Sequence, residues 1–242
     1  MLILSIDTST RTGSVALLRD DLVIDAVSGY EETPHSTRLF RDLEVLQSRA
    51  RFLLEQIDVF AVAAGPGSFT GLRVGLTAVK AWAEVHDKPV AAISGLEAIA
   101  AQSKSLNGES RGAGIVIAPF LDARRGQLFG SLYQVREGNP RSLELISDES
   151  ILTAEEFVDL VTGKCDVVRS VLVSPTPEIL PAPLVHSRLP GIQIETVSAV
   201  LAPIIGQLGF ERAKCGELVD ALRLDANYVR RSDAEKAWKD AG

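Results

Sequence analysis

The sequence predicts an α/β protein built from two lobes of the same plan, and three observations support this prediction. Short apolar runs alternate with segments of helical periodicity along most of the chain. Each half opens with an apolar run that ends at an aspartate, Asp7 or Asp122, and a polar turn and another apolar run follow. The 242 residues suffice to bury about 70–75% of the unfolded surface. We therefore predict two duplicated lobes, residues 1–105 and 106–242.

The first half is expected to begin with a three-stranded meander and to continue with alternating helices and strands. The run from Leu2 to Ile6 is continuously apolar, which indicates a strand buried on both faces. The pair Thr33-Pro34 is a typical start signal for the first helix. The expected strands are residues 2–6, 15–18, 22–27, 59–64 and 90–94, and the expected helices are residues 36–50, 72–85 and 96–102.

The second half is expected to repeat the meander. Thr153 and Glu156 have the spacing of a capping box and predict a helix that runs to about residue 161. Pro203 obscures the start of a late helix, which we expect to pack back on the first lobe. The expected strands are residues 115–121, 128–135 and 143–147, a strand and a proline-rich loop occupy 171–197, and the late helix spans about 198–208.

Residues 64–76, Ala-Gly-Pro-Gly-Ser-Phe-Thr-Gly-Leu-Arg-Val-Gly-Leu, form a glycine-rich turn between a buried strand and a helix. Turns of this kind bind phosphate in many enzymes, because glycine lets a ligand approach the backbone and a helix N-terminus attracts anions. A Walker loop has four residues between its first glycine and Gly-Lys-Ser/Thr. Here five residues separate Gly65 from Gly71, and Leu72 stands in place of the lysine. The spacing therefore disfavours a Walker loop.

The dinucleotide-binding fingerprint also fails in this turn. It requires a glycine at the position of Thr70, and its acidic residue should end a strand. Asp87 has the right distance but lies in a turn before the next strand. Ser68 is interpreted as the N-cap of the following helix rather than as a nucleophile.

Composition excludes several classes of protein. A net charge of −7 predicts poor binding of nucleic acid by the chain alone. Cys165 and Cys215 lie far apart without CxxC spacing, which favours a reduced, cytoplasmic protein. The apolar run at the N-terminus is short and has no basic segment before it, so we expect neither a signal peptide nor a membrane span.

Two meanders that each open with an aspartate at a strand end are typical of ribonuclease-H-like lobes, the architecture of the actin and sugar-kinase superfamily. Within that class the chain resembles the TsaB family, also called YeaZ. The most specific match is the block of residues 64–76. The other matching motifs are Ile6-Asp7-Thr8-Ser9, Pro34-His35-Ser36, Ser94-Gly95-Leu96-Glu97-Ala98, Leu121-Asp122-Ala123-Arg124-Arg125-Gly126 and Tyr228-Val229-Arg230-Arg231-Ser232.

The resemblance implies a function. TsaB is a subunit, usually regarded as non-catalytic, of the bacterial complex that forms N6-threonylcarbamoyladenosine in tRNAs reading codons that start with A. It is similar in fold to the catalytic subunit TsaD and pairs with it through helices of the N-terminal lobe. The ATPase TsaE joins the assembly, and the complex holds the tRNA. The resemblance also implies a homodimer when TsaD is absent, no cofactor in the isolated chain, and ATP or ADP only at the level of the complex.

One segment departs from the family pattern. Between Leu46 and Ile57 the family has a glycine-containing connection, which this chain lacks. The departure leaves the end of the first helix open.

The residues themselves predict no metal site and no catalytic residue. TsaD holds a metal with two histidines at i and i+4, whereas residues 94–99 of this chain contain no histidine. Asp7 and Asp122 are a candidate carboxylate pair near a nucleotide, with Ser9 and Arg124 beside them, and the alternative is that each aspartate braces its own turn. An ATP-dependent phosphotransferase and, last, a metallopeptidase remain the alternative functions.

The helix after the glycine turn indicates a partner interface. Its polar stripe is narrow, so the helix is buried on more than one side, either within its own chain or against a partner. Gly71 and Gly75 are spaced to let another helix cross closely, and we predict that Leu76→Glu abolishes pairing with TsaD without unfolding the chain. The predicted interface residues are His35, Leu39, Phe69, Thr70, Gly71, Leu72, Arg73, Gly75, Leu76 and Val79.

Overall fold

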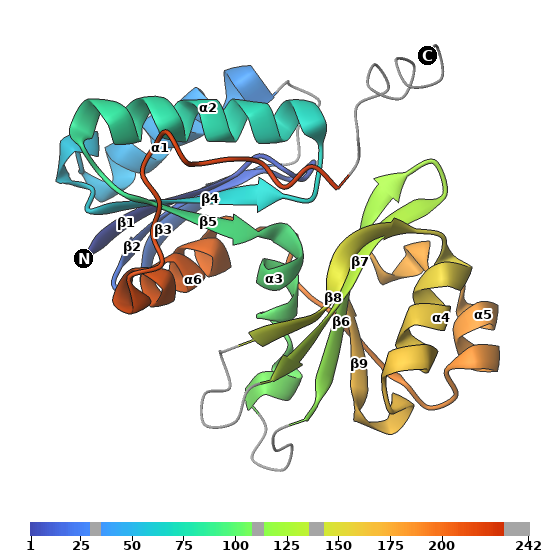
Figure 1. The fold of residues 1–242 in the computed structure, drawn as a ribbon. Helices are drawn as coiled ribbons and strands as arrows, with labels where there is room; N and C mark the ends of the chain where they lie inside the picture. Colours follow the sequence, from blue (N-terminus) through green and yellow to red (C-terminus); the bar gives the residue numbers. More distant parts are fainter. Residues whose placement is uncertain (30–34, 108–113, 136–142, 230–242) are drawn as a thin grey trace, which may run out of the picture. The chain divides into compact units, whose positions relative to one another are not determined.

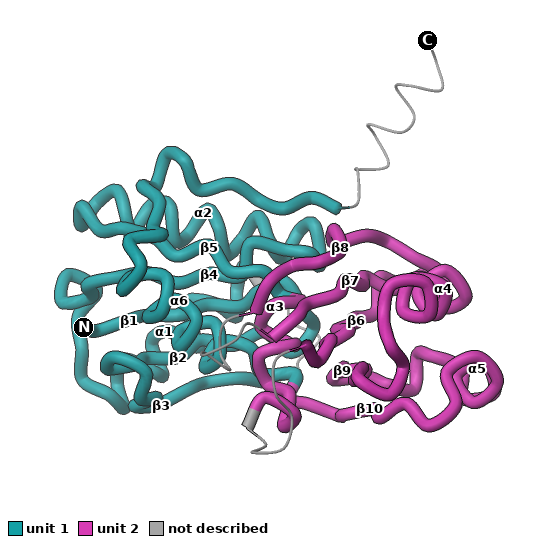
Figure 2. The backbone as a smooth tube through the Cα atoms, turned by 60° about the horizontal axis from the view of Figure 1, so that its bottom comes forward, with its two compact units in different colours: residues 1–95, 199–242 teal, residues 96–198 magenta. Residues whose placement is uncertain are grey.

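The computed structural model describes residues 1–29, 35–107, 114–135 and 143–229. The chain forms two compact units, residues 1–95 with 199–242 and residues 96–198 (Figure 2). The predicted boundary at residue 105 lies ten residues after the observed end of the first segment, Gly95, and the return of the chain to the first unit at Ala199 was not part of the predicted division. The chain leaves the first unit at Gly95 and returns to it at Ala199, because its last helix packs on the first sheet.

The first unit contains a five-stranded sheet of order β3-β2-β1-β4-β5 (Figure 1). Its first three strands form the predicted antiparallel meander, and β4 and β5 extend the sheet in parallel with β1. The predicted strands and helices are thus confirmed, although the second helix starts three residues early. The elements are β1 (Leu2–Asp7), β2 (Ser14–Arg19), β3 (Leu22–Ser28), α1 (His35–Ala50), β4 (Val59–Gly65), α2 (Phe69–His86) and β5 (Val90–Ser94).

The second unit repeats this topology with the order β10-β9-β6-β7-β8. Again a meander is followed by two strands in parallel with its first strand, which confirms the internal duplication. The capping box at Thr153 is also confirmed, since the Thr153 and Glu156 side chains bond each other's backbone N–H. The elements are α3 (Gly95–Ala100), β6 (Val116–Arg124), β7 (Gln127–Val135), β8 (Leu143–Leu152), α4 (Ala154–Lys164), β9 (Ser170–Ser174), α5 (Ala182–Arg188) and β10 (Gln193–Thr196).

Several elements in the second half of the chain differ from the sequence prediction. The region 171–197 contains α5 and β10 in addition to the expected strand, and β8 continues five residues beyond its predicted end. The late helix α6 (Ala202–Cys215) begins four residues after its predicted start, because Pro203 occupies the first turn of the helix. Short 3₁₀ helices complete the chain at Leu54–Gln56, Lys104–Asn107, Val167–Arg169 and Pro177–Ile179.

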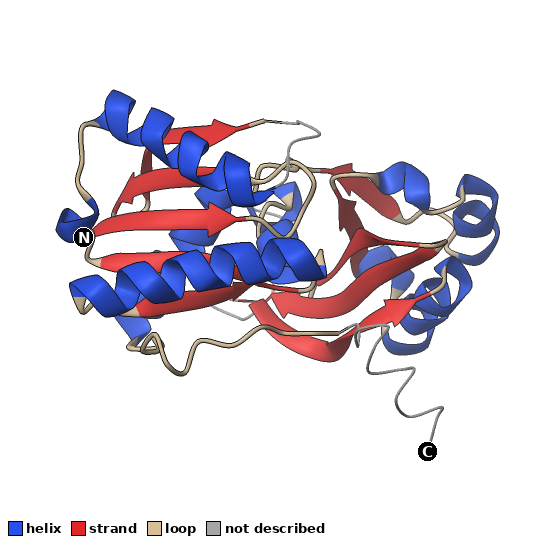
Figure 3. Ribbon diagram, turned by 90° about the horizontal axis from the view of Figure 1, so that it is seen from above, coloured by secondary structure: helices blue, strands red, loops and turns tan. Residues whose placement is uncertain are grey.

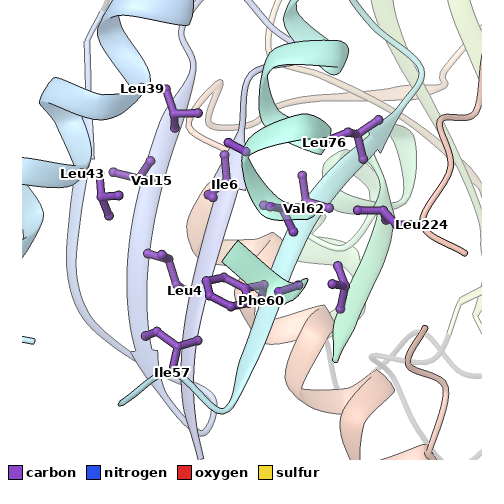
Figure 4. Packing of buried hydrophobic residues seen from close by; sticks show 14 of the residues in the cluster. Leu4, Ile6, Val15, Leu39, Leu43, Ile57, Phe60, Val62, Leu76 and Leu224 are labelled. Carbon is purple, nitrogen blue, oxygen red and sulfur yellow. The ribbon is translucent and has the colours of Figure 1, made fainter. Parts of the chain in front are cut away.

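Helices cover both faces of the first sheet. On one face, Leu4 and Ile6 of β1 and Phe60 of β4 pack with α1 and α2 in a fully apolar core (Figure 4). On the other face lies α6 (Figure 1), and the Ser5 hydroxyl of β1 donates to the Ala202 carbonyl oxygen over 2.7 Å. The close approach of α6 depends on small residues.

A segment without regular secondary structure, residues 217–229, closes the core beside α2 (Figures 1 and 3). We call it the C-terminal segment. Val219 exchanges two backbone hydrogen bonds with Val90 at the free edge of β5. Leu224 is buried in the same core as Leu76 (Figure 4), and the Asn227 N–H donates to the Ala64 carbonyl oxygen over 2.7 Å. The C-terminal segment therefore covers α2 from the side.

No helix among the described residues is long and apolar enough to cross a membrane.

Candidate functional site

The glycine turn between β4 and α2 holds a neighbouring turn of its own chain. The Ser68 N–H donates to the Ser9 carbonyl oxygen over 2.8 Å, and the Ser68 hydroxyl accepts from the Gly71 N–H at 3.3 Å, which confirms Ser68 as the N-cap of α2. A Cβ atom added to Gly67 would lie 2.6 Å from the Ser9 carbonyl oxygen. The glycine at this position thus lets the β1–β2 turn approach closely.

Each of the two candidate aspartates is engaged by its own turn. The buried Asp7 carboxylate accepts from the Ser9 N–H at 2.8 Å, from the Ser9 hydroxyl at 2.6 Å and from the Thr10 hydroxyl at 2.9 Å. In the second unit, Asp122 accepts from the Arg124 N–H at 2.7 Å and pairs with the Arg124 guanidinium at 3.2 Å. Both carboxylates therefore brace the turns that follow β1 and β6.

The space that the missing side chain of Gly75 leaves, which we call the notch at Gly75, is filled by another part of the same chain. The Thr8 hydroxyl donates to the Gly71 carbonyl oxygen over 2.7 Å, and a Cβ added to Gly75 would lie 2.4 Å from the same hydroxyl oxygen. The expectation that another helix crosses at Gly75 is therefore wrong, because the β1–β2 turn occupies this space.

An ion pair that sequence reasoning missed fastens the same turn to α1. The buried Arg38 Nε lies 3.1 Å from the Asp42 Oδ2, and its guanidinium also donates to the carbonyl oxygens of Arg11, at 3.4 Å, and Thr12. The sequence signal for this ion pair was the spacing of four residues between an arginine and an aspartate on a predicted helix. The β1–β2 turn is thus tied to α1, to α2 and to the glycine turn.

Several of the predicted interface residues belong to the core of the chain itself. Leu76 is only 6% exposed and packs, as do Leu39, Leu72 and Val79, with β1 and β4. The helix is apolar over most of its circumference because the sheet, α1 and the C-terminal segment surround it. Leu76→Glu would therefore unfold the first unit, contrary to the sequence prediction. Gly71 and Gly75 are buried as well.

Phe69, Thr70 and Arg73 are exposed at the start of α2, whereas the side chain of His35 lies outside the described residues. Of the predicted interface, these three side chains are the accessible ones.

A second group of accessible side chains lies farther along α1 and α2, and sequence reasoning missed it. Phe40 is 53% exposed and meets Trp82 edge-on, with ring centroids 6.2 Å apart, while Val85 is 76% exposed. Thr77 and Ala81 are exposed and share a stripe of α2 with Val85, because they are spaced by four residues. We call Phe40, Thr77, Ala81, Trp82 and Val85 the α1–α2 face.

The start of α2 carries an aromatic cluster. The Arg73 guanidinium carbon lies 3.9 Å from the centroid of the Phe69 ring, and the Tyr228 ring of the C-terminal segment lies 5.1 Å from it. We call these three residues the stacking cluster. Sequence alone could not join Tyr228 to Phe69 across 159 positions of the chain.

No three His, Cys, Asp or Glu side chains in the described ranges gather in a group that could hold a metal ion.

Burial raises the pKa of the half-buried Cys165 thiol.

The repeated topology, with a meander followed by two parallel strands in each unit, defines a protein of two ribonuclease-H-like lobes, the class of actin and the sugar kinases. A family model described as TsaD, tRNA N6-adenosine threonylcarbamoyltransferase, matches residues 31–161. The tRNA threonylcarbamoyladenosine biosynthesis protein TsaB of Bacillus subtilis is 32% identical over 238 residues, 98% of each chain. The chain belongs to the TsaB family.

Two further relatives agree with this assignment. TsaB of Escherichia coli is 32% identical over 136 residues, which is 55% of each chain. The solved structure of YeaZ from Pseudomonas aeruginosa superposes with a TM-score of 0.70 at 25% identity, covering 94% of this chain and 99% of that one.

Proposed function

We propose that this chain acts in the formation of N6-threonylcarbamoyladenosine in tRNA as the non-catalytic partner of TsaD. The observation that carries the proposal is the similarity to Bacillus subtilis TsaB, which extends over 98% of both chains. A shared fold alone would not suffice, since the two-lobed class hosts many activities.

The geometry of the turns supports a non-catalytic role. The candidate nucleotide-proximal residues lie at the turns that follow β1 and β6. In this chain, Asp7 and Ser9 are joined to each other, and Ser68 holds Ser9. The polar groups that a phosphate or its metal ion would need are engaged within the chain. We therefore propose that any ATP or ADP binds only in the complex.

The α1–α2 face supports the pairing. It exposes the Phe40 ring on α1, which meets Trp82 of α2, and the aliphatic Val85 side chain on α2, and none of its five residues carries a charge. Exposed aromatic and aliphatic groups of this kind form the centre of protein interfaces. We propose that TsaD covers this face, and that a second copy of the chain covers it when TsaD is absent.

Co-expression with the TsaD of the same organism tests the proposal. We expect the two chains to co-purify, and we expect modified tRNA only when both are present. Val85→Glu should abolish co-purification, and Val168→Glu is the matched control, because Val168 is 91% exposed in the second unit. Pairing that survives Val85→Glu would remove the α1–α2 face from the proposal. Full tRNA modification without this chain would refute the function.

Two assembly states follow from the same proposal and are measured separately. Size exclusion of the chain alone should show a dimer, and Val85→Glu should convert it to a monomer.

We further propose that TsaE and tRNA bind only the pair of this chain with TsaD, so that pull-down by the isolated chain recovers neither.

A further inference from the structure

We propose that the stacking cluster of Arg73, Phe69 and Tyr228 binds an unpaired base of the tRNA when the chain is in its complex. This proposal rests on the proposed function, because tRNA is the substrate of that reaction. The cluster lies at the start of α2, where Phe69 and Arg73 continue the exposed stripe that forms part of the α1–α2 face, so the two surfaces adjoin.

The cluster presents flat groups to solvent. Phe69 is 36% exposed and Tyr228 is 40% exposed, with their rings tilted by 44°, and the exposed Arg73 guanidinium lies over the Phe69 ring. Aromatic rings and guanidinium planes are the groups on which proteins stack bases that are not paired in a duplex. Arg73 and Tyr228 are the exposed members on which we propose that the base stacks.

The cluster is also held in place before any ligand binds. Phe69 is the first residue of α2 and follows the Ser68 cap. Tyr228 follows Asn227, whose N–H bonds the end of β4, and the buried Leu224 anchors the same segment. A preformed stack costs less conformational entropy on binding than one that must order.

The charge of Arg73 is available for a phosphate. Within the described residues no carboxylate lies within ion-pair distance of its guanidinium, whereas Arg38, Arg188 and Arg212 each have one.

One acidic residue, Asp225, lies on the C-terminal segment near Tyr228 in the sequence, and its carboxylate accepts from the Ala226 N–H at 2.7 Å. Residues 217–229 also carry Glu217, Asp220 and Arg223, so Arg73 supplies the positive charge of the cluster.

Aromatic rings and arginine also occur at protein interfaces, so the choice of RNA rests on the unpaired charge of Arg73 and on tRNA being the substrate of the proposed function. The α1–α2 face combines apolar groups without charge, which suits a protein, while the cluster combines aromatic faces with an unpaired cation, which suits a base and its phosphate. With a net charge of −7 the chain alone should bind RNA weakly, so the cluster contributes stacking in a complex whose other subunit supplies most of the charge.

The test measures pairing and RNA binding in the same variants. Tyr228→Leu and Arg73→Gln should leave the affinity for TsaD unchanged, but weaken binding of an unmodified tRNA to the complex by at least about fivefold. Tyr228→Trp should retain the affinity of wild type. Leu222→Ala, at an exposed position of the same C-terminal segment, is the matched control and should change neither quantity. Ultraviolet irradiation should cross-link tRNA to the peptide that contains Tyr228.

Several outcomes would overturn the proposal. Unchanged tRNA affinity in both variants would do so, and loss of pairing in Tyr228→Leu would assign the cluster to the protein interface instead. If the wild-type chain does not pair with TsaD, the proposed function fails separately. In that case an anticodon stem-loop RNA is titrated against the chain alone at low salt. Equal affinity of wild type and Tyr228→Leu would overturn the proposal that the stacking cluster binds RNA. Weaker binding by the variant would support it.

Discussion

Gly75→Ala is the perturbation whose consequences the structure specifies most closely. The new methyl group would lie 2.4 Å from the Thr8 hydroxyl oxygen, but 3.6 Å from the Thr8 Cβ and 3.7 Å from its Cγ2. The conflict therefore involves one oxygen atom. That oxygen cannot simply turn away, because it donates to the Gly71 carbonyl oxygen over 2.7 Å in a buried setting.

The expected magnitude follows from three contributions. Alanine in a helix interior gains about 1 kcal/mol over glycine. Overpacking of a buried site costs about 1–3 kcal/mol, and a lost hydrogen bond costs about 1 kcal/mol. Gly75→Ala should therefore lower the free energy of unfolding by about 1–3 kcal/mol.

The double variant tests the assigned cause. Thr8→Ala alone should cost about 1 kcal/mol, because it removes the hydrogen bond to Gly71. In that background the methyl group added at position 75 meets only ordinary van der Waals contacts, so Gly75→Ala should be neutral or stabilising by up to about 1 kcal/mol. The two changes should thus couple by about 1–4 kcal/mol.

Urea unfolding followed by Trp82 fluorescence measures these values. Trp82 lies beside Phe40 and Phe60 in the core of the first unit, and Trp238→Phe removes the other tryptophan of the chain. Gly163→Ala, monitored by circular dichroism, is the matched control, because a Cβ added there meets nothing within 4 Å. Effects of the two substitutions that add within about 0.5 kcal/mol would refute the reasoning.

Three further substitutions test the packing of the first unit by urea unfolding. Arg38→Met should cost up to about 3 kcal/mol, because it leaves the buried Asp42 carboxylate with only the exposed Arg41 guanidinium at 3.6 Å, and equal stability would contradict this account of the ion pair. Gly209→Ala on α6 should cost about 1–2 kcal/mol, since the added Cβ would lie 2.8 Å from the Ala61 Cβ, and a gain in stability would show that α6 can move away. Leu76→Glu should lower stability by more than about 3 kcal/mol in the isolated chain, and a folded variant of wild-type stability would restore the interface interpretation.

Local signals in the sequence predicted most elements of the fold. The capping box at Thr153 and the cap at Ser68 form within a few residues, so they can be recognised without knowledge of the rest of the chain. The α5 helix and the β10 strand were missed because they are only 7 and 4 residues long and lie in a proline-rich stretch, where periodicity has too few residues to emerge.

The candidate surfaces were predicted less well than the fold. Val85 belongs to the helix that was predicted to be buried on more than one side, yet it is exposed, whereas Leu76 was assigned to an interface and is buried. Helical periodicity alone does not say which part of an apolar circumference faces the molecule's own core.

The burial of α2 on more than one side and the tight glycine turn before it could be predicted from the sequence, because composition and spacing are properties of a short stretch. The segments that cover the helix could not be predicted in this way. The β1–β2 turn fills the notch at Gly75, and the C-terminal segment returns across some 150 positions to pack beside it. Contacts between segments so far apart depend on the path of the whole chain, which no local pattern records.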